Sequence, residues 1–316
     1  MEESRIRLIR RFLDVDGMIK LNEPLSLHTS FGVGGPAEVF LSVSRGELMR
    51  LVPFLYKNNE PFTLLGNGSN VLVSDKGLPG LVLCIADRMS EIEVKGKTIR
   101  VQAGALLPRV AQIAAQNGLG GLEFASGIPG TIGGATVMNA GAYGGEMKDV
   151  IKSVNVILSK GGIRIHKTGD CEFGYRTSRF LGNNEEIITD ITFELEEKDE
   201  EEINEKMNEF RAKRSSSQPI DKRSAGSTFK RVAADNDETA LAEDRRPAWQ
   251  LVDAAGCKGL TLGGAKVSEK HCGFVINDGG ASASDIYRLI ETVKERVKEN
   301  SGVELTCEIR MLGDFS

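Results

Sequence analysis

Two glycine-rich segments of this chain carry the residue types from which an anion-binding site can be built. The first is Gly66-Asn67-Gly68-Ser69-Asn70, and the second runs from Ser126 to Gly134 and continues to Gly144. Small side chains let backbone N–H groups converge on an anion, and the amides and hydroxyls of Asn, Ser and Thr add donors. Together the two segments predict a binding site for the diphosphate of a dinucleotide.

Neither segment matches a common nucleotide-binding fingerprint. A GxGxxG dinucleotide motif would need glycine where Val71 stands, and neither segment continues into the Gly-Lys-Ser/Thr of a P-loop. A dinucleotide held here therefore indicates an FAD-binding fold of another kind. The alternative is that both segments are only tight turns, because glycine is the default turn residue.

The composition is that of an ordinary globular protein. Of the 316 residues, 40% are hydrophobic and 27% charged, and the net charge is −5. Such a chain has no positive field to attract nucleic acid or an anionic membrane, so we expect neither as a partner. An anionic ligand must instead be held by local arginines, lysines and backbone N–H groups.

The sequence also limits the compartment and the cofactor chemistry. Its apolar runs are far shorter than the ~20 residues of a spanning helix, and its acidic start argues against a signal peptide. Five scattered cysteines without CxxC spacing fit reduced thiols, and with only three histidines a metal centre is not expected. We therefore expect a cytoplasmic protein without a membrane span or a bound metal.

Hydrophobic periodicity predicts a mixed α+β chain. Helical spacing is found over 48–55, 107–114 and 286–297, and strand runs over 71–73, 81–83, 99–101, 154–158 and 191–195. Ser282 and Asp285 have the spacing of a capping box at the start of the last helix. Alternating apolar residues over 303–311 predict a final strand, and the acidic stretch at 196–206 indicates the approach to a domain boundary.

Three segments in combination resemble the UDP-N-acetylenolpyruvoylglucosamine reductase family. They are His28–Ala37, Gly66–Asn70 and Gly127–Gly134, and the resemblance covers residues from about 20 to 313. It implies a two-lobed FAD-binding domain of the vanillyl-alcohol-oxidase type at 22–86 and 87–205. It also implies a C-terminal α/β substrate domain at 206–316. The segment before these domains, 1–21, is expected to form a short amphipathic helix, because basic and apolar residues are interleaved there.

The resemblance further implies FAD and NADPH as cofactors. Hydride would pass through FAD to a nucleotide-sugar enolpyruvyl ether, and the product would be UDP-N-acetylmuramate. The residues that it implies for cofactor binding lie in the two glycine-rich segments: Gly66, Asn67, Gly68, Ser69, Asn70, Ser126, Gly127, Pro129, Gly130, Thr131, Gly133, Gly134, Asn139, Gly141 and Ala142.

Three catalytic positions carry over from the family. Arg176 follows Tyr175 in a segment similar to the family's Tyr-Arg motif, so Arg176 takes a catalytic role and Tyr175 a substrate-binding one. Ser227 stands in Ser224–Lys230, which looks like the segment with the proton-donor serine; Lys230 is a further substrate-binding candidate. Glu308 lies in a segment similar to the family's terminal strand, whose glutamate faces the substrate.

These residue types suit the implied reaction. Negative charge builds toward the substrate carboxylate, which the Arg176 guanidinium can hold in a bidentate pair. A serine hydroxyl such as that of Ser227 can protonate an enolate-like carbon, and Glu308 would orient the intermediate or assist its protonation. Without the resemblance, the simpler interpretation is that Arg176 forms a surface salt bridge, Ser227 lies in a turn and Glu308 lies on the solvated face of a strand.

The chain departs from the family pattern in two places. Arg231-Val232 follows Lys230 where an Asn-Pro pair is common, and a polar stretch follows at 233–246. No tyrosine lies between Tyr175 and Tyr287, so the chain resembles the shorter branch that lacks a tyrosine-bearing loop. Two other functions stay open from sequence alone: another flavoprotein with the same FAD-binding fold, and a non-catalytic nucleotide-binding module.

Overall fold

The chain divides into two compact units. The computed structural model describes residues 3–14, 19–232 and 246–316, so the polar stretch at 233–246 lies almost wholly outside the described residues. Unit 1 comprises Met1–Asn22, Glu38–Asn67 and Gly80–Lys213, and unit 2 comprises Glu23–Ala37, Gly68–Pro79 and Arg214–Ser316. Within the described residues, no helix combines the length and the apolar character that crossing a membrane requires.

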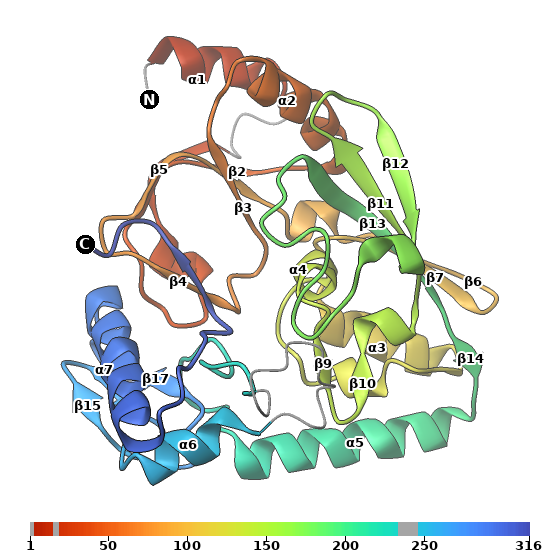
Figure 1. The fold of residues 1–316 in the computed structure, drawn as a ribbon. Helices are drawn as coiled ribbons and strands as arrows, with labels where there is room; N and C mark the ends of the chain where they lie inside the picture. The colour runs from red at the N-terminus through yellow and green to blue at the C-terminus, as the bar shows by residue number, and fades with distance from the viewer. Residues whose placement is uncertain (1–2, 15–18, 233–245) are drawn as a thin grey trace. The chain divides into compact units, whose positions relative to one another are not determined.

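The two larger sheets described in unit 1 have four and five strands (Figure 1). The first has the order β1 (Ile19–Pro24), β2 (Pro36–Ser42), β5 (Leu78–Cys84), β3 (Phe62–Leu65). The second is antiparallel, with the order β12 (Ile163–Lys167), β11 (Ile151–Leu158), β13 (Glu186–Glu194), β7 (Thr98–Gln102), β6 (Ile92–Lys95). The strand runs predicted from sequence in this part of the chain are therefore confirmed.

The helices described in unit 1 are α1 (Glu3–Arg10), α2 (Arg45–Lys57), α3 (Leu107–Gln116), α4 (Ile132–Val137) and α5 (Glu200–Ser217). Of these, α2 and α3 bury the faces that the periodicity over 48–55 and 107–114 predicts. In α2 a Ser44–Glu47 capping box starts the helix, and Leu48, Leu51 and Leu55 are fully buried. The helices and both sheets share one apolar core, in which each buried leucine contributes roughly 1.5–3 kcal/mol.

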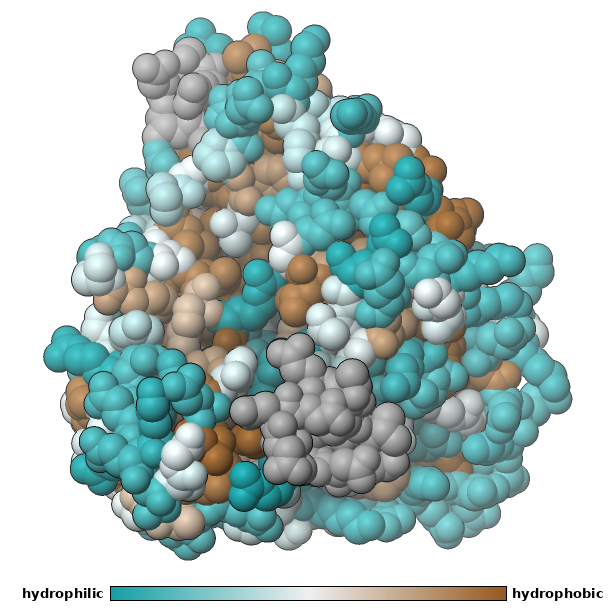
Figure 2. Space-filling model, in the orientation of Figure 1, coloured by the Kyte–Doolittle hydropathy of each residue, from teal (hydrophilic) through white to brown (hydrophobic). Residues whose placement is uncertain are grey.

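Helix α5 is different because most of its surface is hydrophilic. Its buried residues are Ile203, Met207 and Phe210, and Figure 2 shows hydrophilic side chains along its length. The acidic run that precedes and opens this helix is thus a solvated surface, as its charge predicts.

A buried carboxylate ties β12 and β13 to the segment that precedes β13. Glu186 is 7% exposed, and its oxygens lie 3.1 Å from Arg179 Nε, 3.2 Å from His166 Nε2 and 3.1 Å from Arg164 Nη1. Burial alone would raise the pKa of Glu186, but His166 and Arg179 lower it, and the pKa ends below its ordinary value of 4.5. The carboxylate is therefore stabilised in its charged form by the folded chain.

Replacing Glu186 with glutamine is expected to destabilise the protein by about 2–3 kcal/mol at neutral pH, because the partly exposed Arg179 and the buried His166 lose the carboxylate that both contact. Since the folded pKa is depressed, the contribution of Glu186 is fully present above the unfolded pKa. This contribution is lost as the pH falls through the folded pKa. The difference in unfolding free energy between the variant and the unaltered protein therefore becomes smaller below about pH 4.5. Urea unfolding at several pH values measures both effects.

Glu194→Gln is the matched control for this substitution. Glu194 pairs with Lys152 at 2.7 Å, but both side chains are at least half exposed, so its loss should cost less than about 1 kcal/mol. An equal cost for the two variants, or a deficit at Glu186 that does not change with pH, would contradict this account.

The described residues of unit 2 form a small sheet, a strand pair and two α-helices. The sheet is antiparallel with the order β15 (Thr261–Leu262), β16 (Ala265–Val267), β17 (Val275–Asn277), and β4 (Val71–Val73) pairs in parallel with β18 (Arg310–Leu312). Helices α6 (Ala248–Ala254) and α7 (Ala283–Ser301) pack on each other, and α7 packs on the sheet (Figure 1). A second apolar core, separate from that of unit 1, lies between these elements.

The start of α7 confirms the predicted capping box and adds a residue to it. Ser282 and Asp285 cap each other's backbone N–H groups. The carboxylate of Asp75 also accepts hydrogen bonds from the N–H groups of Ala283 and Ser284, both at 2.8 Å. The loop after β4 therefore anchors the longest helix of unit 2.

The final strand is shorter than the alternation over 303–311 predicts. Only Arg310–Leu312 forms a strand, and Cys307 makes an isolated antiparallel bridge with Phe229. Leu305 and Ile309 are buried as the pattern predicts. Alternation thus reports which side chains are buried, whereas a strand also needs a partner along its whole length.

Candidate functional site

The first glycine-rich segment is divided between the two units. Gly66 and Asn67 belong to unit 1, and Gly68, Ser69 and Asn70 belong to unit 2. Gly68 has φ +60°, and a Cβ atom added to it would lie 1.9 Å from the carbonyl oxygen of His28. Only glycine fits here, because both the backbone conformation and the close approach exclude a side chain.

In the second segment some backbone donors serve the fold and others do not. The N–H groups of Ile132 and Gly133 bond to the carbonyls of Ala105 and Ala103, at 2.8 and 2.7 Å. Within the described parts of the chain, the N–H groups of Gly127, Gly130 and Thr131 have no hydrogen-bond acceptor. These three donors are available to an anionic ligand.

Two further observations fit a bound cofactor at this segment. Ser126 is 5% exposed, and its buried Oγ has no hydrogen-bond partner among the described residues. A buried hydroxyl without a partner costs free energy, so this hydroxyl is available to a polar group of a ligand or to a water molecule. In addition, Gly66 approaches Thr131 so closely that an added Cβ would lie 2.6 Å from Thr131 Oγ1, which brings residues of the two glycine-rich segments together within unit 1.

The predicted catalytic arginine lies on a tight turn. Gly174 and Thr177 exchange backbone hydrogen bonds, which leaves Tyr175 and Arg176 as the two central residues. Arg176 has φ +54°, a left-handed conformation that is unfavourable for a residue with a side chain. Its Nη2 donates to the carbonyl of Gly141 at 2.9 Å, and its guanidinium lies over the Tyr175 ring, 5.2 Å from the centroid.

The Tyr-Arg turn and the second glycine-rich segment are therefore joined within unit 1. Besides the bond from Arg176 to Gly141, the hydroxyl of Ser178 donates to the carbonyl of Val137 at 2.8 Å. The side chain of Asn139 donates to the carbonyl of Gly174 at 3.0 Å. The sequence places these segments more than thirty residues apart, and only the fold brings them together.

In unit 2 the segments of Ser227 and Glu308 run side by side. The N–H of Glu308 bonds to the carbonyl of Thr228, next to Ser227, at 2.8 Å, and the N–H of Lys230 bonds to Thr306 at 2.9 Å. The side chain of Asn70 donates to the carbonyl of Glu308 at 3.2 Å. The structure thus brings Ser227, Lys230 and Glu308 into one neighbourhood, with Asn70 beside them.

Thr228 anchors the segment that carries Ser227, and the sequence does not reveal this. It is fully buried, and its hydroxyl accepts the N–H of Val275 at 3.0 Å while its own N–H bonds to Gly273. These contacts anchor the serine segment to β17. Nothing in the local Gly-Ser-Thr-Phe pattern distinguishes this threonine from an exposed one.

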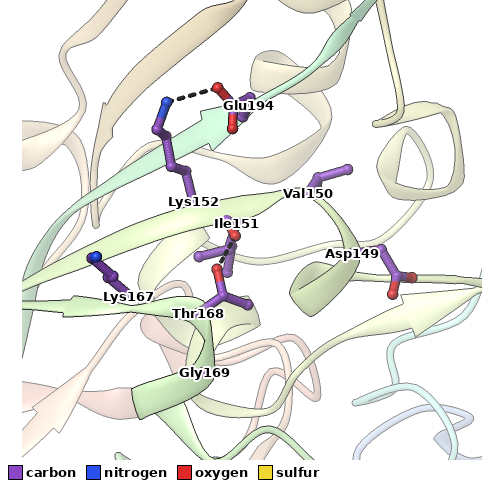
Figure 3. A pocket seen from close by; sticks show the side chains of 8 residues that line it. All are labelled: Asp149, Val150, Ile151, Lys152, Lys167, Thr168, Gly169 and Glu194. Carbon is purple, nitrogen blue, oxygen red and sulfur yellow. Dashed lines mark hydrogen bonds and ion pairs between the residues drawn. The ribbon is translucent and has the colours of Figure 1, made fainter.

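A surface cavity of about 380 Å³ lies elsewhere in unit 1 (Figure 3). Its lining includes Lys152, Lys167 and Glu194, and Lys152 is already paired with Glu194 at 2.7 Å. None of the predicted cofactor or catalytic residues lines it. Its charged, open character is unlike the mostly apolar pockets that hold cofactors, so we assign it no part in the site.

Comparison with known proteins identifies the family. Residues 218–312 match the C-terminal domain of UDP-N-acetylenolpyruvoylglucosamine reductase, and residues 36–166 match an FAD-binding domain. A curated UDP-N-acetylenolpyruvoylglucosamine reductase from Caldanaerobacter subterraneus subsp. tengcongensis is 45% identical over 95% of both chains. The chain belongs to the UDP-N-acetylenolpyruvoylglucosamine reductase family. A second such reductase, from Clostridium kluyveri, is 40% identical over 99% of this chain and 98% of its own.

A solved structure agrees with this assignment. The UDP-N-acetylenolpyruvylglucosamine reductase of Thermus caldophilus has a TM-score of 0.77 and 36% identity, covering 93% of this chain and 98% of that one. The predicted family, the α+β fold class and the FAD cofactor are therefore confirmed, and the chain is an FAD-dependent oxidoreductase. The predicted site residues and the four-segment domain division remain predictions.

Replacing Gly66 with alanine is expected to weaken FAD binding. The new Cβ would lie 2.6 Å from Thr131 Oγ1, which accepts the N–H of Gly134 at 3.4 Å, so the threonine must move and the cap of α4 is lost. A cap is worth about 1 kcal/mol, so if FAD binds only the capped arrangement, restoring it in the complex raises Kd roughly fivefold. Fluorescence titration of the flavin-free protein with FAD measures this change.

Gly169→Ala is the control for this effect. No atom lies within 4 Å of the Cβ that it would add, and its φ is not positive. Its FAD affinity should equal that of the unaltered protein. Equal affinities for the Gly66 variant and this control would show that the close approach of the two segments does not matter for binding.

Proposed function

We propose that the protein catalyses the NADPH-dependent reduction of UDP-N-acetylglucosamine enolpyruvate to UDP-N-acetylmuramate. Bound FAD would supply the carrier through which a hydride passes from NADPH to the terminal carbon of the enolpyruvyl group. The observation that carries this proposal is family membership over 95% of the chain. The placement of Ser227 and Glu308 in adjacent segments of unit 2 adds to it.

The proposed cofactor contacts come from the two glycine-rich segments. The N–H groups of Gly127, Gly130 and Thr131 and the buried hydroxyl of Ser126 would hold polar groups of FAD. The remaining residues proposed for this role are Gly66, Asn67, Gly68, Ser69, Asn70, Pro129, Gly133, Gly134, Gly141 and Ala142. Backbone donors of this kind hold a diphosphate without needing a cationic surface.

Arg176 would hold the carboxylate of the substrate, on which charge accumulates as the hydride arrives. A fixed guanidinium stabilises that charge more in the transition state than in the ground state, because the charge is larger there. Tyr175, whose ring lies under the Arg176 guanidinium, would help to fix its direction and contact the substrate.

Ser227 would donate the proton to the carbon that bears the ether oxygen. Ser227 is half-buried and precedes Thr228, whose hydroxyl accepts the N–H of Val275, and this anchored neighbour supports the proposed role. Lys230 would bind the substrate from the same segment, and Glu308 would orient the intermediate or assist its protonation. General acid catalysis of this kind contributes typically 10²–10⁴-fold to a rate.

Several further properties belong to this proposal. The reaction would supply a peptidoglycan precursor in the cytoplasm, and through it cell-wall biogenesis, cell shape and cell division. The partner would be a small nucleotide-sugar substrate, with no nucleic acid involved. We also propose residues 22–86 and 87–205 as FAD-binding lobes and 206–316 as the substrate domain.

Steady-state turnover tests the proposed reaction. NADPH oxidation should depend on the enolpyruvyl sugar nucleotide, yield one UDP-N-acetylmuramate per NADPH and consume little oxygen. Oxygen uptake that is independent of this substrate would instead indicate another flavoprotein oxidase. A protein that takes up no FAD would indicate a non-catalytic nucleotide-binding module.

A further inference from the structure

The side chain of Asn139 has no N–H donor left for a ligand. It is fully buried, and its Nδ2 donates to Glu146 Oε2 at 2.9 Å and to the carbonyl of Gly174 at 3.0 Å. Its Oδ1 accepts the N–H of Lys148 at 3.0 Å. Because a primary amide has two N–H donors, both are already used within the protein.

Asn139 contacts the Tyr-Arg turn at its first residue. Gly174 closes the turn by exchanging hydrogen bonds with Thr177, and the carbonyl that accepts from Thr177 also accepts from Asn139. The turn carries Arg176 with φ +54°, a conformation that costs about 1–2 kcal/mol for a residue with a Cβ atom. External contacts must therefore hold this backbone in place.

Asn139 is itself suited to this position. It follows α4 and has φ +42°, a left-handed conformation in which asparagine is several-fold enriched among residues other than glycine. Its backbone N–H bonds to the carbonyl of Thr136, so the end of α4 fixes where the amide lies. The amide thus links the helix end, the β9–β10 hairpin (Gly141–Ala142 and Gly145–Glu146) and the turn.

We propose that the side chain of Asn139 is a positioning residue for Arg176: it sets the Tyr-Arg turn and thereby aims the guanidinium at the substrate carboxylate. This inference rests on the proposed function, in which Arg176 binds that carboxylate. It moves the amide of Asn139 from the expected cofactor contacts to the catalytic apparatus. A misplacement of a catalytic group by about 1 Å costs on the order of 10²-fold in rate.

Asn139→Asp tests the proposal because it keeps the size and shape of the side chain but removes both donors. The new carboxylate would face Glu146 and the carbonyl of Gly174 with no proton between them. We expect reoxidation of the reduced flavin by the substrate to slow by about 10²-fold. Reduction of the flavin by NADPH and the FAD content per chain should stay as in the unaltered protein.

A double-mutant cycle with Arg176→Ala separates positioning from a general structural role. If Asn139 acts through Arg176, Asn139→Asp causes no further loss of reoxidation rate once Arg176 is gone. Losses that multiply in the double variant would overturn the inference. If Asn139→Asp does not fold, Asn139→Ser, which keeps one donor, takes its place in the cycle.

The pH dependence gives a second readout. The charged groups around Asn139 are Glu146, Lys148, which pairs with Glu146 at 2.9 Å, Asp149, which accepts the N–H of Glu146, and Arg176. Two carboxyl groups in contact share a proton as the pH falls, and this proton restores one donor. The loss of rate in Asn139→Asp should therefore shrink from pH 8 to pH 6, and a loss that does not change with pH would contradict the proposal.

Thermal unfolding of the flavin-free protein supplies a readout that does not depend on activity. The shared carboxyl pair has a raised pKa in the folded state, so the stability deficit of Asn139→Asp is smallest at low pH and grows as the pH rises. A deficit that is equal at pH 5 and pH 8 would show that the introduced carboxylate does not face Glu146 in the way that the amide of Asn139 does.

Asn117→Asp is the matched control. Asn117 also follows a helix, and its Nδ2 donates to a backbone carbonyl at 2.8 Å, but it is exposed and has no contact with the turn. Its reoxidation rate should be unchanged. If the unaltered protein is not reoxidised by the enolpyruvyl sugar nucleotide at all, the proposed function fails; if it is, and the losses multiply, only the role of Asn139 fails.

Discussion

Replacing Ser227 with alanine is expected to leave reduction of the flavin by NADPH intact and to slow its reoxidation by the enolpyruvyl substrate by about 10²–10⁴-fold. The two half-reactions differ because only the second needs a proton on carbon. The hydroxyl of Ser227 is the proposed source of that proton. Stopped-flow absorbance under anaerobic conditions follows each half-reaction separately.

Ser224→Ala is the control for this prediction. Ser224 lies three residues before Ser227 in the same loop and is also half-buried. Its removal should leave both half-reactions within about twofold of the unaltered protein. Normal turnover by the Ser227 variant would exclude it as the proton donor and shift that role to Glu308.

Arg176→Ala is the second substitution with a large expected effect. Removing a donor aimed at developing negative charge costs about 2.7–4 kcal/mol in comparable sites, or roughly 10²–10³-fold in kcat/KM. Arg176→Lys should recover only part of this loss, because an ammonium group cannot form the bidentate pair with a carboxylate. Steady-state kinetics with the enolpyruvyl substrate measure both variants.

The FAD content of the Arg176 variants must be measured alongside their kinetics. Arg176 also donates to the carbonyl of Gly141, so its loss can loosen the glycine-rich segment as well as the substrate contact. Arg109, an exposed arginine of α3, provides the control variant Arg109→Ala, which should retain full activity. A loss at Arg176 that comes entirely from missing FAD would contradict a role in substrate binding.

Much of the fold could be predicted from sequence because the spacing of apolar residues determines which side chains are buried. The buried face of α2, that of α7 and its capping box all follow from residues less than fifteen positions apart. The strand expected over 303–311 could not be predicted in this way, because strand formation depends on a partner strand that is distant in sequence. Alternation sets which side chains are buried, but not which backbone groups pair.

The candidate site was predictable where a backbone constraint leaves a mark on residue type. Glycine at 68 is required by φ +60° and by the approach of His28, and clustered glycines reveal such places. Thr228 leaves no such mark, since its contact with Val275 joins residues 47 positions apart. The left-handed backbone at Asn139 favours asparagine, but the hydrogen bond from its side chain to Gly174, 35 residues away, could not be predicted from sequence. From sequence alone, an asparagine in a glycine-rich loop is equally compatible with contacting a bound cofactor and with holding a neighbouring turn in place.

The central claim is that the glycine-rich segments hold FAD and that the bound coenzyme serves the enolpyruvyl substrate. An anaerobic visible spectrum of the purified protein tests it most directly. We predict a flavin band that NADPH bleaches and that the enolpyruvyl sugar nucleotide then restores in stoichiometric amount. A protein that stays colourless after incubation with excess FAD, or a bleached band that this substrate leaves unchanged, would contradict the claim.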